Sequence, residues 1–244
     1  MKLAGKVALI TGGSEGIGFG VAELLASEGA HVAIVSRNSV KLDKALESLK
    51  AVSEQPVLAL PADVAKADEV QATVDQVLSV HGKIDILVNG AGIITKELRS
   101  VQDVDVQEWE RVMATNTTGT LLFSRAVLPG MQAQNHGYII NILSTGAFRS
   151  LPQNCVYAAS KYGARAITEA LIAENHGTGV RISSVSPGPV ETAVWDYRKE
   201  KATPEDRAKM LLPADIAQIV LFLVTLPERV HIDNLTVRPW YLFN

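Results

Sequence analysis

Short apolar runs alternate with amphipathic stretches along most of this chain, and this alternation restricts the possible folds more than any other feature. The apolar runs are rich in Val and Ile and cover residues 7–11, 31–36, 57–60, 84–88, 138–143 and 180–185. Strands that alternate with helices are typical of βαβ units, in which consecutive strands are parallel. Because the runs are almost continuously apolar, we expect both faces of the sheet to be covered.

The pattern therefore predicts an α/β fold with a doubly wound parallel sheet of about seven strands and helices on both faces. A seventh strand is expected at 235–237, after a helix over 213–226 whose first residue, Pro213, suits a first helical turn. The length of 244 residues suits a single domain, residues 1–244. The charged stretch 189–212 does not fit the alternation, and because long loops are often functional we expect it to cover the substrate.

Composition narrows the classes of partner. The chain is 47% hydrophobic and 20% charged with a formal net charge of -3, which suits neither a disordered chain nor a nucleic-acid binder. The longest apolar runs, such as 219–226, are too short to span a bilayer, so neither a membrane segment nor a signal peptide is expected. Cys155 has no second cysteine to pair with, which favours a reducing cytoplasm, and the five scattered histidines indicate no metal site. We therefore expect a small-molecule partner.

A glycine-rich turn directly follows the first predicted strand. Its sequence, TGGSEGIG over residues 11–18, lies between a strand and a helix, where a dinucleotide-binding turn is found. Glycine permits close backbone approach, so backbone N–H groups and the helix N-terminus can face a pyrophosphate. The turn predicts a Rossmann-type fold, with cofactor contacts from Gly12, Ser14, Gly16, Ile17 and Gly18. The alternative is a structural turn that uses glycine for helix packing.

The spacing G-x-x-x-G-x-G resembles that of the short-chain dehydrogenase/reductase (SDR) family, and later segments match the family in order, over residues 6–192. The resemblance implies further cofactor contacts after the third, fourth and sixth strands, from Asp63, Val64, Asn89, Gly90, Ala91, Pro187, Gly188, Val190 and Thr192. These sites follow the carboxyl ends of strands, where open α/β sheets bind ligands. Gly90 departs from the family's Asn-Asn-Ala-Gly element, which removes one amide side chain and leaves the backbone role.

Tyr157 and Lys161 are the expected reacting pair. A spacing of four residues on a helix places the phenol and the ammonium on one face, about 6 Å apart along the axis. A free phenol has a pKa of about 10, and a cation within about 4–6 Å favours the phenolate. Ser144, at the end of the fifth predicted strand, can hydrogen-bond the substrate oxygen as that oxygen gains negative charge. The resemblance adds Asn116, which in the family holds a water beside the lysine.

Taken one at a time, these residues also have structural explanations, as a packed aromatic, a helix cap or a solvated charge. Together, behind a cofactor turn, they predict an oxidoreductase that interconverts a ketone or aldehyde and an alcohol by hydride transfer, with Tyr157 as the acid/base. Tyr157 and Lys161 are also expected to contact the cofactor. The alternatives are a nucleotide-sugar epimerase or dehydratase, and a dinucleotide-binding regulatory protein without catalysis.

The residues after the second predicted strand favour NADP(H) over NAD(H). NAD-selective folds place an Asp or Glu there, and its charge repels a 2′-phosphate. Here Ser36 is neutral, and the Arg37 guanidinium, followed by Asn38, can form charge-assisted hydrogen bonds with phosphate. Glu15, just before the second glycine of the motif, argues for NAD(H), which is the alternative cofactor.

Two further expectations concern the substrate pocket and the assembly. Ile93, Ile94, Phe148, Leu151, Trp195 and Tyr197 are expected to line an apolar pocket, with Arg149 as a candidate contact for an acidic group. The resemblance implies a homotetramer or homodimer that pairs through the helices holding Asn116 and Tyr157. The tail that begins at His231 lacks the glycine-rich ending common in the family.

Overall fold

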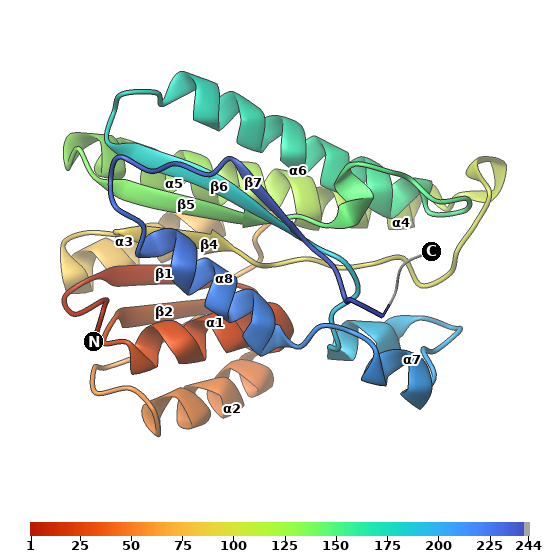
Figure 1. Ribbon diagram of the computed structural model, residues 1–244, viewed down its shortest axis with the longest axis horizontal. Coiled ribbons are helices and arrows are strands. Elements are labelled where there is room, and N and C mark those ends of the chain that lie inside the picture. Colours follow the sequence, from red (N-terminus) through yellow and green to blue (C-terminus); the bar gives the residue numbers. More distant parts are fainter. Residues whose placement is uncertain (242–244) are drawn as a thin grey trace.

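A parallel sheet forms the centre of the protein in a computed structural model that describes residues 1–241 (Figure 1). Within these residues the sheet has seven strands in the order β3-β2-β1-β4-β5-β6-β7, and all neighbouring strands are parallel. The strands are β1 (Val7–Thr11), β2 (His31–Ser36), β3 (Leu58–Pro61), β4 (Ile86–Asn89), β5 (Gly137–Ile142), β6 (Val180–Pro187) and β7 (Asn234–Val237). The predicted doubly wound sheet of about seven strands is confirmed.

Helices lie between almost all consecutive strands. They are α1 (Gly16–Ser27), α2 (Ser39–Lys50), α3 (Ala67–His81), α4 (Val106–Met113), α5 (Gly119–Ala133), α6 (Cys155–Glu174), α7 (Pro204–Ala208) and α8 (Pro213–Val224). α8 begins with the predicted Pro213. Each helix of residues 1–241 is too short or too polar to cross a membrane. In the same part of the chain, no three His, Cys, Asp or Glu side chains are grouped as a metal ion would require.

The helices cover both faces of the sheet, as Figure 1 shows. α1, α2 and α8 pack on one face, where Ile10 of β1 shares a core with Val220 of α8. α3, α5 and α6 pack on the other face, where Leu9 of β1 shares a core with Phe123 of α5. Successive side chains of a strand point to opposite faces, so neighbouring residues of β1 belong to different cores. This double burial is the reason that the strands are almost continuously apolar.

Several strand ends differ from the predicted bounds, and β4 shows a physical reason. The predicted run 84–88 becomes a strand that begins only at Ile86. Asp85, which is 3% exposed, accepts a hydrogen bond from the Val7 N–H through its carboxylate at 2.8 Å. The Asp85 side chain thus binds the Val7 N–H, which could otherwise form a backbone hydrogen bond between β1 and β4. Lys83 neutralises the same carboxylate at 2.9 Å.

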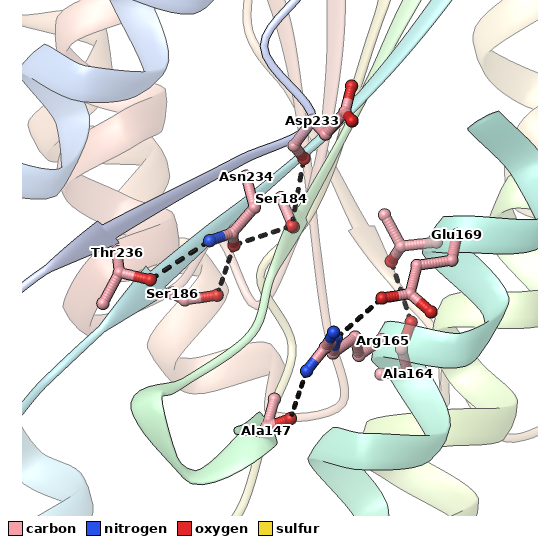
Figure 2. Close-up of polar contacts among 10 residues, drawn as sticks. Ala147, Ala164, Arg165, Glu169, Ser184, Ser186, Asp233, Asn234 and Thr236 are labelled. Carbon is pink, nitrogen blue, oxygen red and sulfur yellow. Dashed lines mark hydrogen bonds and ion pairs between the residues drawn. The ribbon is translucent and has the colours of Figure 1, made fainter. Parts of the chain in front are cut away.

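The edge strand β7 is joined to β6 by a polar cluster (Figure 2). The hydroxyls of Ser184 and Ser186 donate to Oδ1 of Asn234 at 3.0 and 2.7 Å. Nδ2 of Asn234 donates to Thr236 at 3.1 Å. Ser184 and Ser186 are both buried, so Asn234 supplies a polar partner in a place that water does not reach freely. The cluster fixes the last strand to the sheet through side chains as well as backbone.

Candidate active site

The strand order reverses between β1 and β4, and the predicted site residues gather around this point. β2 and β3 lie on one side of β1, while β4 to β7 follow on the other side. Thr11 and Asn89 are paired in register at the carboxyl ends of β1 and β4. The glycine turn follows the first of these strands and the Asn-Gly-Ala segment follows the second. Open α/β sheets bind ligands at such a reversal.

The glycine turn has no room for side chains on the face that meets β4. Gly12 has a φ of +69°, and a Cβ there would lie 2.9 Å from the backbone of Ala91. A Cβ on Gly18 would collide with the carbonyl oxygen of Gly12. α1 begins at Gly16, and the preceding Glu15 makes no capping bond with its side chain. The N–H groups of the first helical turn are therefore available to an anion, and the turn fits a pyrophosphate.

Thr11 organises the two loops, and sequence reasoning missed it. Its hydroxyl accepts hydrogen bonds from the N–H groups of Gly90 and Ala91, each at 3.1 Å. A Cβ on Gly90 would lie 2.8 Å from the Thr11 carbonyl oxygen, which explains why glycine suits this position. The Asn89 amide donates instead to Asn141 of β5 at 2.8 Å, inside the protein. Its Oδ1 is buried and has no hydrogen-bond partner within residues 1–241.

Two cations and two carboxylates lie close to the carboxyl end of β2, where the adenosine ribose is expected. The Arg37 guanidinium lies 3.7 Å from the carboxylate of Asp63. Lys41, which the sequence analysis did not single out, pairs with Glu15 at 2.7 Å. Asn38 caps α2 by accepting the Lys41 N–H at 3.0 Å, which places this lysine on the first turn of the helix. The charge of Glu15 is therefore balanced by a neighbour.

The Pro-Gly segment after β6 reaches the glycine turn. β6 ends at Pro187, and the Gly188 N–H donates to the carbonyl oxygen of Val237 at 2.7 Å. A Cβ on Gly16 would lie 3.2 Å from the methyl group of Thr192. The structure thus brings Thr192 beside the start of α1, while Gly188 packs against the residues that follow β7. Val64, in contrast, is buried under the first turn of α5, where a Cβ on Gly119 would touch it.

Tyr157 and Ser144 lie together at the end of β5. A Cβ on Gly146 would lie 3.5 Å from Cε1 of the Tyr157 ring. Ser144 accepts the Gly146 N–H at 3.0 Å and so caps the short turn Thr145–Ala147. Burial raises the pKa of the Tyr157 phenol, while hydrogen bonding with Ser144 and the positive charge of Arg198 act in the opposite direction. Ser144 is thus both a cap and a partner of the phenol.

Lys161 lies one turn further along α6 and is buried. Its Nζ donates to the Ile142 carbonyl oxygen at 2.9 Å and lies 6.0 Å from the centre of the Tyr157 ring. Burial lowers the pKa of Lys161 to about 8, so the ammonium is still the main form at neutral pH. The sequence predicts that this charge, together with that of an oxidised nicotinamide, favours the phenolate. In the protein alone, burial is the largest influence on the Tyr157 pKa and raises it. The phenol is therefore protonated at neutral pH, as a proton donor must be.

Asn116 lies in a π-helical segment, Ala114–Thr118, that joins α4 to α5. Its side chain accepts the Ile93 N–H at 2.8 Å and donates to the Ile93 carbonyl oxygen at 2.9 Å. Gly92 lies between Asn116 and the lysine, because a Cβ there would be 3.6 Å from Asn116 Oδ1 and 3.5 Å from Lys161 Nζ. The sequence analysis placed Asn116 in an ordinary helix. The wider turn is frequent at functional sites.

Three of the six residues predicted to line an apolar pocket lie at the surface or in polar surroundings. Phe148 stacks against Arg165 on the outside of α6, with 4.2 Å between the guanidinium carbon and the ring centre. Figure 2 shows Arg165 held there by Glu169 and the Ala147 carbonyl. Leu151 is 59% exposed. Tyr197 lines a cavity of about 290 Å³ whose other walls are charged or polar.

Comparisons with known proteins identify relatives over the whole length of the chain. A family model described as short chain dehydrogenase matches residues 6–203. An uncharacterized oxidoreductase of Staphylococcus aureus is 37% identical over 237 residues, 97% of this chain and 98% of that protein. An alcohol dehydrogenase from Thermococcus sibiricus, complexed with 5-hydroxy-NADP, has a TM-score of 0.89 at 28% identity and 98% coverage of both chains. A 3-ketoacyl-(acyl-carrier-protein) reductase from Brucella melitensis, complexed with NADH, has a TM-score of 0.86 at 31% identity, covering 96% of this chain and 97% of the other.

Proposed function

The chain belongs to the short-chain dehydrogenase family, and from this we propose that it interconverts a ketone or aldehyde and an alcohol with Tyr157 as the acid/base and NADP(H) as the preferred cofactor. The observation that carries the proposal is the group formed at the carboxyl end of β5 by the half-buried Tyr157 and Ser144 and the buried Lys161. Tyr157 offers a proton donor, Ser144 a hydrogen-bond donor and Lys161 a cation, all close to one place where a carbonyl oxygen can bind.

Tyr157 donates its phenolic proton to the carbonyl oxygen in reduction and takes it back in oxidation. The raised pKa of Tyr157 keeps that proton in place at neutral pH, so the phenol can donate it to a carbonyl oxygen. Ser144 uses a lone pair for the Gly146 N–H, so its hydroxyl hydrogen remains for the substrate oxygen as negative charge develops. Lys161 stabilises the phenolate that is left when the proton departs. A nicotinamide dinucleotide, when bound, supplies the hydride donor or acceptor.

Asn116 positions the loop beside Tyr157, Ser144 and Lys161 by binding the backbone of Ile93. By binding both the N–H and the carbonyl of Ile93, it fixes the loop after β4 beside Lys161. We propose that it also holds a water next to the Lys161 ammonium, through which the phenol regains its proton from solvent. The π-helical turn supports this role because its wider backbone lies at Asn116, the residue proposed to bind the water, and such turns are frequent at functional sites.

The predicted cofactor residues would hold the dinucleotide along the carboxyl edge of the sheet. Gly12, Ser14, Gly16, Ile17 and Gly18 would meet the pyrophosphate, for which the close packing of the turn and the uncapped start of α1 leave room. Asp63, Val64 and the segment from Asn89 to Ala91 would meet the adenosine. Pro187, Gly188, Val190 and Thr192 would meet the nicotinamide end, together with Tyr157 and Lys161.

Preference for NADP(H) is supported by the charges after β2. Ser36 and Asn38 are neutral, and the Arg37 guanidinium is half exposed, with only a 3.7 Å contact to Asp63. Lys41 pairs with Glu15 and so removes the repulsion that this carboxylate would exert on a 2′-phosphate. Relatives use both cofactors, since the Thermococcus sibiricus structure contains 5-hydroxy-NADP and the Brucella melitensis structure contains NADH. NAD(H) is the alternative for this chain.

We further propose a single domain over residues 1–244, of which 242–244 lie outside the described residues. The segment 189–212 would cover the substrate, two or four copies would assemble, and the protein would act in the cytoplasm. The segment is supported in this role by its position: Lys199 donates its N–H to the carbonyl of Lys96, in the loop that follows β4, at 3.0 Å.

Replacing Tyr157 by Phe tests the proposed reaction. We expect turnover with the best carbonyl substrate to fall by about two orders of magnitude or more, while cofactor affinity stays within about twofold, because a positioned acid is lost and the ring remains. NADPH oxidation with a panel of ketones and aldehydes measures the first quantity and fluorescence titration the second. Tyr162→Phe, which removes an exposed hydroxyl from the same helix, is the control and should leave turnover unchanged. Near wild-type turnover by Tyr157→Phe would exclude the proposed acid, and cofactor binding without any turnover would favour a regulatory protein.

A further inference from the structure

Arg198 is a partly buried cation beside the proton donor. It follows the short helical turn Ala193–Tyr197 in the segment that lies beyond the carboxyl ends of the strands (Figure 1). Its guanidinium and the Tyr157 phenol act on each other electrostatically. The guanidinium carbon lies 5.7 Å from the centre of the Trp195 ring. Arg198 therefore lies at the same edge of the sheet as the phenol and within reach of its electric field.

The backbone around Arg198 is held from both sides. The Trp195 indole N–H donates to the Val190 carbonyl oxygen at 2.8 Å. On the other side, the Lys199 N–H donates to the Lys96 carbonyl oxygen at 3.0 Å. These two anchors connect the segment to the end of β6 and to the loop after β4. The backbone that carries Arg198 is therefore held on both sides, unlike that of an arginine on a free loop.

The carboxylates of the neighbourhood are already paired with other cations. Arg207 binds Glu191 at 2.8 Å and Asp196 at 2.5 Å. Glu97 is bound by Lys199 at 3.1 Å and by Arg99 at 3.0 Å. Within residues 1–241, no carboxylate lies within 4.0 Å of the Arg198 guanidinium. Its Nε is buried and has no hydrogen-bond partner in the same part of the chain.

A buried guanidinium without an anion is costly, and partial burial lowers the pKa of Arg198 for this reason. A ligand anion that reached Arg198 would remove this cost and would form charge-assisted, often bidentate, hydrogen bonds. Because the segment that carries Arg198 is bound to the loop after β4, an anion held by its unpartnered Nε would lie at the same edge of the sheet as Tyr157. A neutral ketone would leave the guanidinium unpaired.

We propose that Arg198 binds an anionic oxygen group of the substrate, a carboxylate or a phosphate ester, and so makes the protein selective for oxo acids or phosphorylated ketones over neutral ketones. The inference rests on the proposed function and adds the substrate class. Arg198 replaces Arg149 as the acid-binding candidate. Arg149 is exposed on the surface of the loop after β5.

Matched substrate pairs test the inference directly. kcat/KM is measured with 2-, 3- and 4-oxo acids against their methyl esters, and with dihydroxyacetone phosphate against dihydroxyacetone, at saturating cofactor. We expect the wild-type protein to prefer at least one anionic member by tenfold or more. Arg198→Met should lose at least tenfold with that substrate and less than threefold with its neutral partner, and Arg198→Lys should recover part of the loss. Arg229→Met makes the same change at an exposed arginine between α8 and β7 and should match wild type.

Three results would overturn the inference. One is equal kcat/KM of the wild-type protein for the charged and neutral members of every pair. Another is an equal loss by Arg198→Met on both members, which would mean that Arg198 acts on the Tyr157 phenol. The third is a rise in cofactor KM without any change in substrate discrimination.

A binding measurement separates this inference from the proposed function. Butyrate and butyramide are titrated by calorimetry into wild type and Arg198→Met in the presence of NADP⁺. Butyrate binding that exceeds butyramide binding and is lost in the variant supports the anion site, even if no carbonyl in the panel is reduced. Equal binding of the two compounds to wild type would reject the site, whatever the turnover.

Discussion

We expect Arg37 and Lys41 to decide how the site treats the 2′-phosphate that distinguishes NADP from NAD. Charge-assisted hydrogen bonds contribute roughly 1.5–3 kcal/mol, so Arg37→Ala should weaken NADPH binding by about tenfold to a hundredfold. NADH binding should change little, because it carries no 2′-phosphate. Fluorescence titration of both cofactors measures these affinities, and Lys44→Ala, at an exposed lysine of α2, is the control. Equal or tighter binding of NADH by the wild-type protein would contradict the preference.

Single residues can be proposed from the sequence where a motif indicates the chemistry, but not where two distant side chains meet. Arg37 is a candidate because it directly follows a strand, and its role stays a prediction. The Glu15–Lys41 pair could not be predicted, because the two residues are 26 positions apart and meet only through the conformations of two long side chains. The burial that raises the phenol pKa could not be predicted either, since spacing along a helix gives the distance to Lys161 but not the degree of burial. Thr11 left one signal, a hydroxyl at the last position of the first strand.

At the scale of elements, β7 depends on the cluster around Asn234 (Figure 2). Asn234→Ala should lower the free energy of unfolding by about 1–3 kcal/mol, because it leaves the buried Ser186 hydroxyl without its acceptor. Ser184 keeps a second acceptor in the Asp233 carbonyl and should contribute less. Urea unfolding followed by far-UV circular dichroism measures the change. Thr236→Ala removes the exposed hydroxyl that accepts from Asn234 Nδ2, so water can replace it and the cost should be less than about 1 kcal/mol. An equally small effect of Asn234→Ala would show that backbone pairing alone holds β7.

Elements were predictable where hydrophobic periodicity defines them. The seven strands and the start of α8 follow from apolar runs and from Pro213. The π-helical turn at Ala114–Thr118 was not predicted, because its residues have no periodicity that distinguishes it from an α-helix. The late start of β4 depends on one buried carboxylate, Asp85, whose hydrogen bond to Val7 joins residues 78 positions apart. Local sequence carries no sign of such a contact.

The whole molecule exposes apolar side chains on the helices expected to pair. Trp109 on α4, Leu121 on α5 and Tyr162 on α6 are 37%, 44% and 42% exposed. We expect light scattering at micromolar concentration to give about two or four times the chain mass of 26.2 kDa. Leu121→Glu should reduce the mass toward one chain, whereas Val40→Glu, at an exposed valine on α2, should not. A wild-type mass close to that of one chain would exclude the assembly.

The strand order also sets the course by which the sheet can be built while the ribosome releases the chain. β1, β2 and β3 are neighbours, so the first 61 residues already contain three adjoining strands. β4 then adds to the free side of β1, and β5, β6 and β7 add outward in the order of their synthesis. No strand has to enter between two that are already joined. Because amino-terminal parts emerge and fold first, the sheet can grow during translation without undoing any earlier pairing.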